Sequence, residues 1–353
     1  MPREVRNDEE DEESEGLWKG LVRDLLVAGI IVVIVLVGIY VYTGVWPPLV
    51  VVESQSMQHS GTESYFGVID TGDMVFQQAA PNRADIITYL EGRASGYATY
   101  GDYGDVIIFR HASDPTPVIH RAIMYVTLHN NGTYATADVD RLSQLTGWEA
   151  TTDSGPIACP PTCSGLYLRT LTIHRMGFRQ NLGITFDFAN SFLFFAPRSG
   201  YITMGDYNAA FISCATPPFD PCAGTPYDRQ WLPVQGDIIG RARGEFPWFG
   251  LLKLTLQPTI TCCSGWGDPE APKNSWDSLV VSLVVLFAFP FILEYAARGW
   301  KKYVSPRLPE IRWPWRRAKT KPERRRPPED ADESSENPRR GRRKPPKEES
   351  SEP

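Results

Sequence analysis

The chain has 353 residues, 42% of them hydrophobic, with 36 Lys and Arg against 42 Asp and Glu. Its net charge of −6 averages an acidic beginning against a basic end, so it excludes little about partners. The sequence holds no glycine-rich phosphate loop, no internal repeat and no basic stretch with interleaved aromatic residues. We therefore expect no nucleic-acid partner.

The first long apolar segment follows an acidic segment, residues 1–24. It is LLVAGIIVVIVLVGIYVY, residues 25–42, which carries no charge. As a helix it would span about 27 Å, close to the hydrocarbon thickness of a bilayer. Trp46-Pro47-Pro48 follows it in place of a small-residue cleavage site. We therefore predict a retained transmembrane helix over 25–42 and not a cleaved export signal.

Residues 43–277 have the pattern of a mainly β domain. Runs rich in β-branched and aromatic residues are separated by turn residues, and no run of ten or more has strong helical periodicity. The predicted strands are 50–54, 73–77, 105–110, 118–128, 165–174, 191–196, 201–206 and 237–244. The strands at 105–110 and 118–128 are joined by HASDPTP, which predicts a hairpin with a wide loop.

A second apolar segment, SLVVSLVVLFAFPFIL (278–293), lies between Trp276 and Trp300. Tryptophans at both edges are typical of a membrane–water interface. This pattern predicts a second transmembrane helix over 278–297. The remaining residues, 298–353, are basic and rich in proline, and we expect them to be a disordered cytoplasmic tail.

Basic residues predict the orientation of both segments. They lie on the side of each segment that leads to a chain end: Lys19, Arg23, Arg298, Lys301 and Lys302. Because cytoplasmic flanks are enriched in Lys and Arg, both ends are predicted to be cytoplasmic and residues 43–277 extracytoplasmic.

The cysteines agree with this orientation. An even number of cysteines on the non-cytoplasmic side predicts disulfides, although six allow about 15 pairings. All fall within 43–277: Cys159, Cys163, Cys214, Cys222, Cys262 and Cys263. Asn131-Gly132-Thr133 in the same region is either a glycosylation site or an ordinary turn.

Ser54 and Ser56 suggest a hydrolytic site. On an extended strand two residues so spaced share one face. A nucleophilic hydroxyl needs a base, and His120, on an otherwise apolar face of the strand 118–128, is the natural candidate, with His174 as an alternative. Surface serines and a core histidine would give the same pattern. Asp206 and Asp228 are candidates for a carboxylate that orients the histidine.

Four segments in order add a family resemblance: VVVESQSM after the first span, GDVIIF…VIHRAI, YITMGDYN and GRARGEFPWFG. Together they resemble the conserved boxes of type I signal peptidases, in the branch found in archaea and the endoplasmic reticulum. The bacterial branch has a lysine where His120 precedes Arg121 here. The resemblance covers about half of the chain and implies the signal-peptidase-type β fold.

The resemblance implies that Ser56 is the nucleophile, His120 the general base, and Ser54 an oxyanion-hole donor together with the Ser56 amide. It matches Asp206 to the first aspartate of a GDNN-like box and Asp228 to a later one.

Two departures from the family pattern leave questions open. GDYN stands in place of GDNN, and a cysteine-bearing stretch separates Asp206 from Asp228, so Asp220 is an alternative to Asp228. The long chain between His120 and Gly205 suggests an inserted subdomain at about 127–198.

The expected function is that of a membrane-bound serine endopeptidase that cleaves signal peptides from exported preproteins at the outer face of an archaeal cytoplasmic membrane. The expected partners are preproteins and the lipid bilayer, with the protein translocation machinery as a candidate; no metal or organic cofactor is implied. The alternative is a catalytically inactive, membrane-anchored β domain that binds cell-envelope partners. A self-cleaving repressor is disfavoured by the two spans.

Overall fold

The computed structural model describes residues 4–111, 114–157, 167–258 and 262–300. The chain divides into two units, Met1–Pro290 and Phe291–Pro353. Residues 291–300 are the described part of the second unit, and they are helical to Gly299. The predicted tail lies almost wholly outside the described residues.

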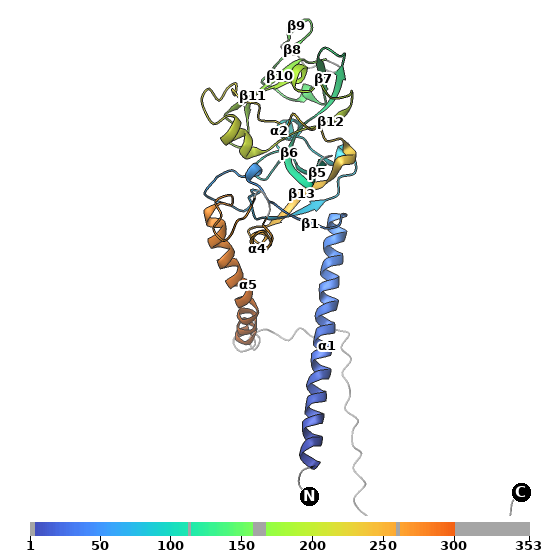
Figure 1. Cartoon of the computed structure of the whole chain (residues 1–353), viewed down its shortest axis with the longest axis vertical. Coiled ribbons are helices and arrows are strands. Elements are labelled where there is room, and N and C mark those ends of the chain that lie inside the picture. Colours follow the sequence, from blue (N-terminus) through green and yellow to red (C-terminus); the bar gives the residue numbers. More distant parts are fainter. Residues whose placement is uncertain (1–3, 112–113, 158–166, 259–261, 301–353) are drawn as a thin grey trace, which may run out of the picture. The chain divides into compact units, whose positions relative to one another are not determined.

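Two helices contain the predicted membrane segments (Figure 1). Helix α1 runs over Glu4–Thr43 and therefore begins well before the apolar stretch, within the acidic segment. Helix α5 runs over Lys273–Gly299 and continues through Pro290. Mean hydropathy reaches 2.9 in Gly20–Thr43 and 2.3 in α5, and most of their apolar side chains are exposed. By length and composition both are able to cross a membrane.

The first sheet has seven antiparallel strands, in the order β1-β2-β13-β5-β6-β12, with β7 also paired to β6 (Figure 1). Their bounds are β1 Leu49–Val51, β2 Met74–Gln78, β5 Val106–His111, β6 Asp114–Asn130, β7 Ala135–Val139, β12 Ser199–Met204 and β13 Ile238–Phe246. The sheet places β5 and β6, which are neighbours in sequence, between β13 and β12. Strands far apart in the chain therefore meet around β6.

Part of the region predicted to be an insertion, residues 148–187, forms a second sheet in the order β11-β10-β8-β9, whereas the end of β6 and β7 in the same region belong to the first sheet. The strands are β8 Trp148–Thr152, β9 Gly155–Ile157, β10 Thr170–Met176 and β11 Leu182–Asp187. Ile123 and Val126 of β6 share one hydrophobic cluster with Leu171 of β10 and Phe186 of β11. The second sheet, residues 148–187, therefore shares a hydrophobic core with the first sheet.

Short elements complete the fold. They are the helices α2 Tyr89–Ser95, α3 Phe188–Ser191 and α4 Gly250–Leu256, the strands β3 Ala98–Thr99 and β4 Asp102–Tyr103, and the single turns η1 Gln55–Met57, η2 Arg83–Asp85, η3 Leu142–Gln144, η4 Asn208–Ser213 and η5 Gln235–Asp237. Strands β3 and β4 pair with each other. The short helices and turns lie in the connections between strands, except α4, which lies between β13 and α5.

Three local predictions were wrong. The strand predicted over 50–54 ends at Val51. The apolar run 191–196 is not a strand: the Asp187 side chain accepts a hydrogen bond from the Asn190 amide (3.1 Å) and starts α3 instead. The wide loop of the β5–β6 hairpin is shorter than expected, because His111 still pairs with Asp114.

Among the described residues there are two disulfides, Cys214–Cys222 and Cys262–Cys263. They agree with the prediction of disulfides for four of the six cysteines. Cys159 and Cys163 lie outside the described residues.

A buried carboxyl pair, Asp70 and Asp73, supports the turn before β2. Asp73 accepts hydrogen bonds from the amides of Asp70 (2.8 Å) and Trp248 (2.9 Å). Burial raises the pKa of Asp70 to about 7. Burial and the neighbouring Asp70 charge raise the pKa of Asp73 well above its usual range. Both groups are therefore more easily protonated in the folded protein than in the unfolded chain.

Asp70→Asn should weaken the pH dependence of stability. Between about pH 4 and pH 7 the unfolded chain ionises Asp70 while the folded protein retains its proton, so this group makes stability fall as pH rises. The melting temperature of the variant should therefore fall by less than that of the wild type over this range. Asp153→Asn, which removes an exposed carboxylate, is the control. Identical pH profiles for wild type and Asp70→Asn would contradict the assignment.

Candidate active site

The segment that carries Ser56 is a turn held in place by a buried residue. Ser54 is extended and precedes η1, which contains Ser56. Met57, the last residue of η1, is 1% exposed and packs in a core cluster with Val52 and Val75. The predicted extended geometry was therefore wrong at Ser56, yet the Ser54 hydroxyl still donates to Ser56 Oγ at 3.3 Å.

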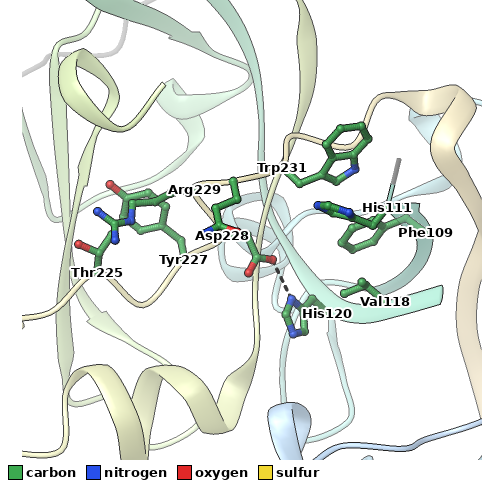
Figure 2. A pocket seen from close by; sticks show the side chains of 10 residues that line it. Phe109, His111, Val118, His120, Thr225, Tyr227, Asp228, Arg229 and Trp231 are labelled. Carbon is green, nitrogen blue, oxygen red and sulfur yellow. Dashed lines mark hydrogen bonds and ion pairs between the residues drawn. The ribbon is translucent and has the colours of Figure 1, made fainter. Parts of the chain in front are cut away.

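His120 lies on β6 opposite Ile107 of β5 and is 8% exposed. Its Nδ1 is 2.7 Å from Asp228 Oδ2, and Figure 2 shows this carboxylate pointing at the ring. The Thr203 hydroxyl donates to the same oxygen at 2.5 Å. The Asp228 amide in turn donates to the Thr203 carbonyl at 2.9 Å, so the end of β12 fixes Asp228. Within the described part of the chain, no hydrogen bond engages His120 Nε2, so this nitrogen is the one that can accept a proton from a hydroxyl.

The Ser56 carbonyl and the His120 ring both lie beside Gly205. A Cβ atom built at Gly205 would lie 2.5 Å from the Ser56 carbonyl oxygen and 3.2 Å from His120 Nε2. Both groups therefore approach the same small region, which only glycine leaves open. Among the hydrogen bonds of the described residues, none joins Ser56 Oγ to the His120 ring. Such bonds are often long in enzymes without substrate and shorten when substrate binds.

Asp228 controls the protonation of His120. Burial lowers the pKa of His120, but the charge and hydrogen bond of Asp228 and the charge of Asp206 outweigh burial and raise it. Burial raises the pKa of Asp228, and its interactions with His120 and Thr203 outweigh this and lower it. The pair therefore favours an ionised carboxylate beside an imidazole that accepts a proton readily.

The other two candidate aspartates have different partners. Asp206, expected as an aid to His120, makes no hydrogen bond to that ring in the described structure. It binds Arg121 Nε at 2.9 Å and Nη2 at 2.6 Å, and its Oδ2 is 3.0 Å from His59 Nε2. Asp220 lies 2.7 Å from His174 Nδ1. By geometry, Asp228 is the aspartate paired with His120.

The Arg121–Asp206 pair is fully buried. Burial raises the pKa of Asp206, but Arg121 and His59 outweigh it and lower the pKa to about 2. Arg121 also donates to backbone carbonyls between Thr99 and Gly104, so its charge is well coordinated. Sequence reasoning missed His59 as a partner of Asp206 and Thr203 as a partner of Asp228, because no local spacing indicates either contact.

A cavity of about 610 Å³ adjoins Ser56 and His120. Residues 49–54 line one part of it and residues 116–120 another, with Ile108 and Lys253 completing the wall. Its volume is within the usual range for ligand sites.

A second cavity of about 330 Å³ also contacts His120 and contains Asp228. Figure 2 shows Phe109, His111 and Trp231 gathered at one side of it. Within the described residues no group of His, Cys, Asp and Glu side chains could hold a metal ion.

Comparison with protein-family models finds no match to this chain, and comparison with curated proteins finds none either. The family resemblance therefore remains a prediction from the four sequence segments, and the roles of the site residues are argued from their geometry.

Asp228→Asn should lower the pKa of His120, because the Asp228 charge and hydrogen bond raise it in the wild type. With five histidines in the chain, the ¹³C-labelled His120 signal can be assigned by substitution and titrated by NMR. Asp220→Asn is the matched control, since it removes the partner of His174 and leaves His120 in place. An unchanged His120 titration midpoint in Asp228→Asn would show that the pair does not form.

Proposed function

We propose that this protein is a serine endopeptidase of the signal peptidase type, which removes signal peptides from exported preproteins at a membrane surface. The observation that carries the proposal is that the Ser56 carbonyl and His120 Nε2 both lie beside Gly205 and that both residues line one cavity, with His120 bound to Asp228. In this proposal the Ser56 hydroxyl is the nucleophile, the His120 imidazole is its base, and the Asp228 carboxylate orients the base.

In the proposed reaction, Ser56 Oγ attacks the carbonyl carbon at the end of the signal peptide while His120 Nε2 takes the hydroxyl proton. The Ser54 hydroxyl and the Ser56 amide stabilise the oxyanion. His120 then gives the proton to the departing amine of the mature protein, and an ester on Ser56 remains. His120 next activates a water molecule, which hydrolyses the ester and restores Ser56. Asp228 stabilises the imidazolium that forms in each half of the reaction.

The 610 Å³ cavity suits an extended peptide. β1 is an edge strand of the sheet, and the pairing of β12 with β6 ends at Arg121, so residues 117–120 of β6 lie beyond the end of that ladder. Both segments line the cavity beside Ser56. An extended segment lying there could add backbone hydrogen bonds to a strand edge, a common mode of peptide recognition. The substrate chain would thus be presented with its carbonyl near Ser56.

The attachment of α1 supports a site close to the membrane. The Ala79 amide donates to the Thr43 carbonyl at 2.7 Å, and Tyr42 contacts Phe76 of β2 edge to face. The end of α1 is therefore fixed to the sheet that carries the site. Since a signal peptide is cut just after its own apolar segment, an enzyme anchored in this way would meet the cleavage site near the bilayer surface.

The proposal predicts that Ser56→Ala and His120→Ala each abolish cleavage of a preprotein by the purified full-length protein in detergent or liposomes. Loss of a general base alone typically costs ~10²–10⁴-fold in rate, and loss of the nucleophile should cost at least as much. Ser154→Ala, at an exposed serine of the insertion, should cleave at the wild-type rate.

Cleavage at the wild-type rate by both site variants would refute the proposed roles. A wild-type protein that binds envelope proteins and cleaves no preprotein would support the alternative of an inactive binding domain.

A further inference from the structure

His59 links the inserted region to the candidate site. Its ring stacks on Phe178 with ring centroids 3.9 Å apart and an interplanar angle of 6°. On the other side, its Nε2 is 3.0 Å from Asp206 Oδ2. Phe178 lies in the turn between β10 and β11. The His59 ring therefore contacts both this turn and Asp206, a buried residue that follows β12.

The neighbouring turn residues make contacts of the same kind. Gln180 Nε2 donates to Asp102 Oδ1 and to Tyr89 Oη, both at 3.3 Å. The Arg179 guanidinium lies 4.6 Å from the centre of the Phe211 ring. Each of these partners lies outside the insertion. The β10–β11 turn is therefore docked on the part of the chain that surrounds Asp206.

Asp206 transmits this contact to the site. It is 2% exposed and is bound by Arg121, which holds its position. At the residue before it, Gly205, an added Cβ would lie 2.5 Å from the Ser56 carbonyl oxygen and 3.2 Å from His120 Nε2. His59 itself follows Ser56 by three positions. The segment that contains Ser56 therefore contacts the Gly205–Asp206 segment at two places: beside Gly205, and through His59 and Asp206.

We propose that the β10–β11 turn of the insertion positions the nucleophile: Phe178 holds His59 against Asp206, and this contact keeps the Ser54–Met57 segment in place beside Gly205 and His120. His59 and Phe178 are positioning residues, since neither lines the cavity beside Ser56. The inference rests on the proposed function for its consequence on the reaction, but the contact that it describes can be tested without it.

The kinetic test compares Phe178→Ala with Phe178→Tyr, which keeps a ring to stack on His59, in the full-length protein. Phe178→Ala should lower kcat ~10- to 100-fold with little change in KM, because a misplaced nucleophile slows the reaction more than it weakens substrate binding. Phe178→Tyr should have a kcat close to the wild-type value, because its ring can still stack on His59. Phe194→Ala is the control, since Phe194 is in the insertion but 93% exposed.

Hydrogen exchange provides the second measurement. Peptides that cover residues 53–60 should exchange faster in Phe178→Ala and in His59→Ala than in the wild type, while peptides from β5 and β6 exchange as before. Faster exchange over the whole domain, with a lower melting temperature, would mean that Phe178 only stabilises the fold and would overturn the inference. Wild-type kcat and wild-type exchange in Phe178→Ala would overturn it as well.

If the wild-type protein cleaves no preprotein, the proposed function fails, and the exchange of residues 53–60 still decides whether Phe178 and His59 position this segment.

Discussion

The close approach at Gly205 is the constraint on which the site depends. Ser56 comes from a turn after β1, His120 from the middle of the sheet on β6, and Gly205 from the end of β12. These segments are far apart in sequence, and no side chain at 205 fits between the Ser56 carbonyl and the imidazole. The sheet order brings β12 next to β6, and the buried Met57 holds the Ser56 turn against the core. The fold thus brings the backbone of Ser56 and the imidazole of His120 to the same glycine, and both residues line one cavity.

The two carboxylates near this glycine have different hydrogen-bond partners: Asp206 binds Arg121, and Asp228 binds His120. Asp206 is neutralised by Arg121 in a fully buried ion pair, where an unpaired charge would be very costly. Asp228 is free of that pair and binds His120, with Thr203 supporting it. Asp206 is hydrogen-bonded to Arg121 and Asp228 to His120, and the charge of Asp206 adds to that of Asp228 in raising the pKa of His120. The raised pKa of His120 follows from this arrangement.

Much of the architecture follows from the sequence, because it depends on local patterns. Uncharged apolar runs indicated both long helices, and two runs rich in β-branched residues joined by HASDPTP indicated the β5–β6 hairpin. The extended geometry expected for Ser56 was wrong, because the chain turns into η1 after Ser54 and buries Met57. The partner of His120 could not be chosen among three aspartates from spacing, since the choice depends on where β12 and the following segment lie. The contact of His59 with Phe178 could not be predicted either, because the two residues are far apart in sequence and meet only through tertiary packing.

The most direct measurement of the central claim is preprotein cleavage by Gly205→Ala, compared with Gly236→Ala, where an added Cβ meets no atom within 4 Å. The added methyl group at 205 must displace the Ser56 carbonyl or the His120 ring, so Gly205→Ala should lose ~100-fold or more in kcat/KM, as expected for a small misplacement of reacting groups. Gly236→Ala should remain close to the wild type. Wild-type cleavage by Gly205→Ala would contradict the claim that Ser56 and His120 act together across this glycine.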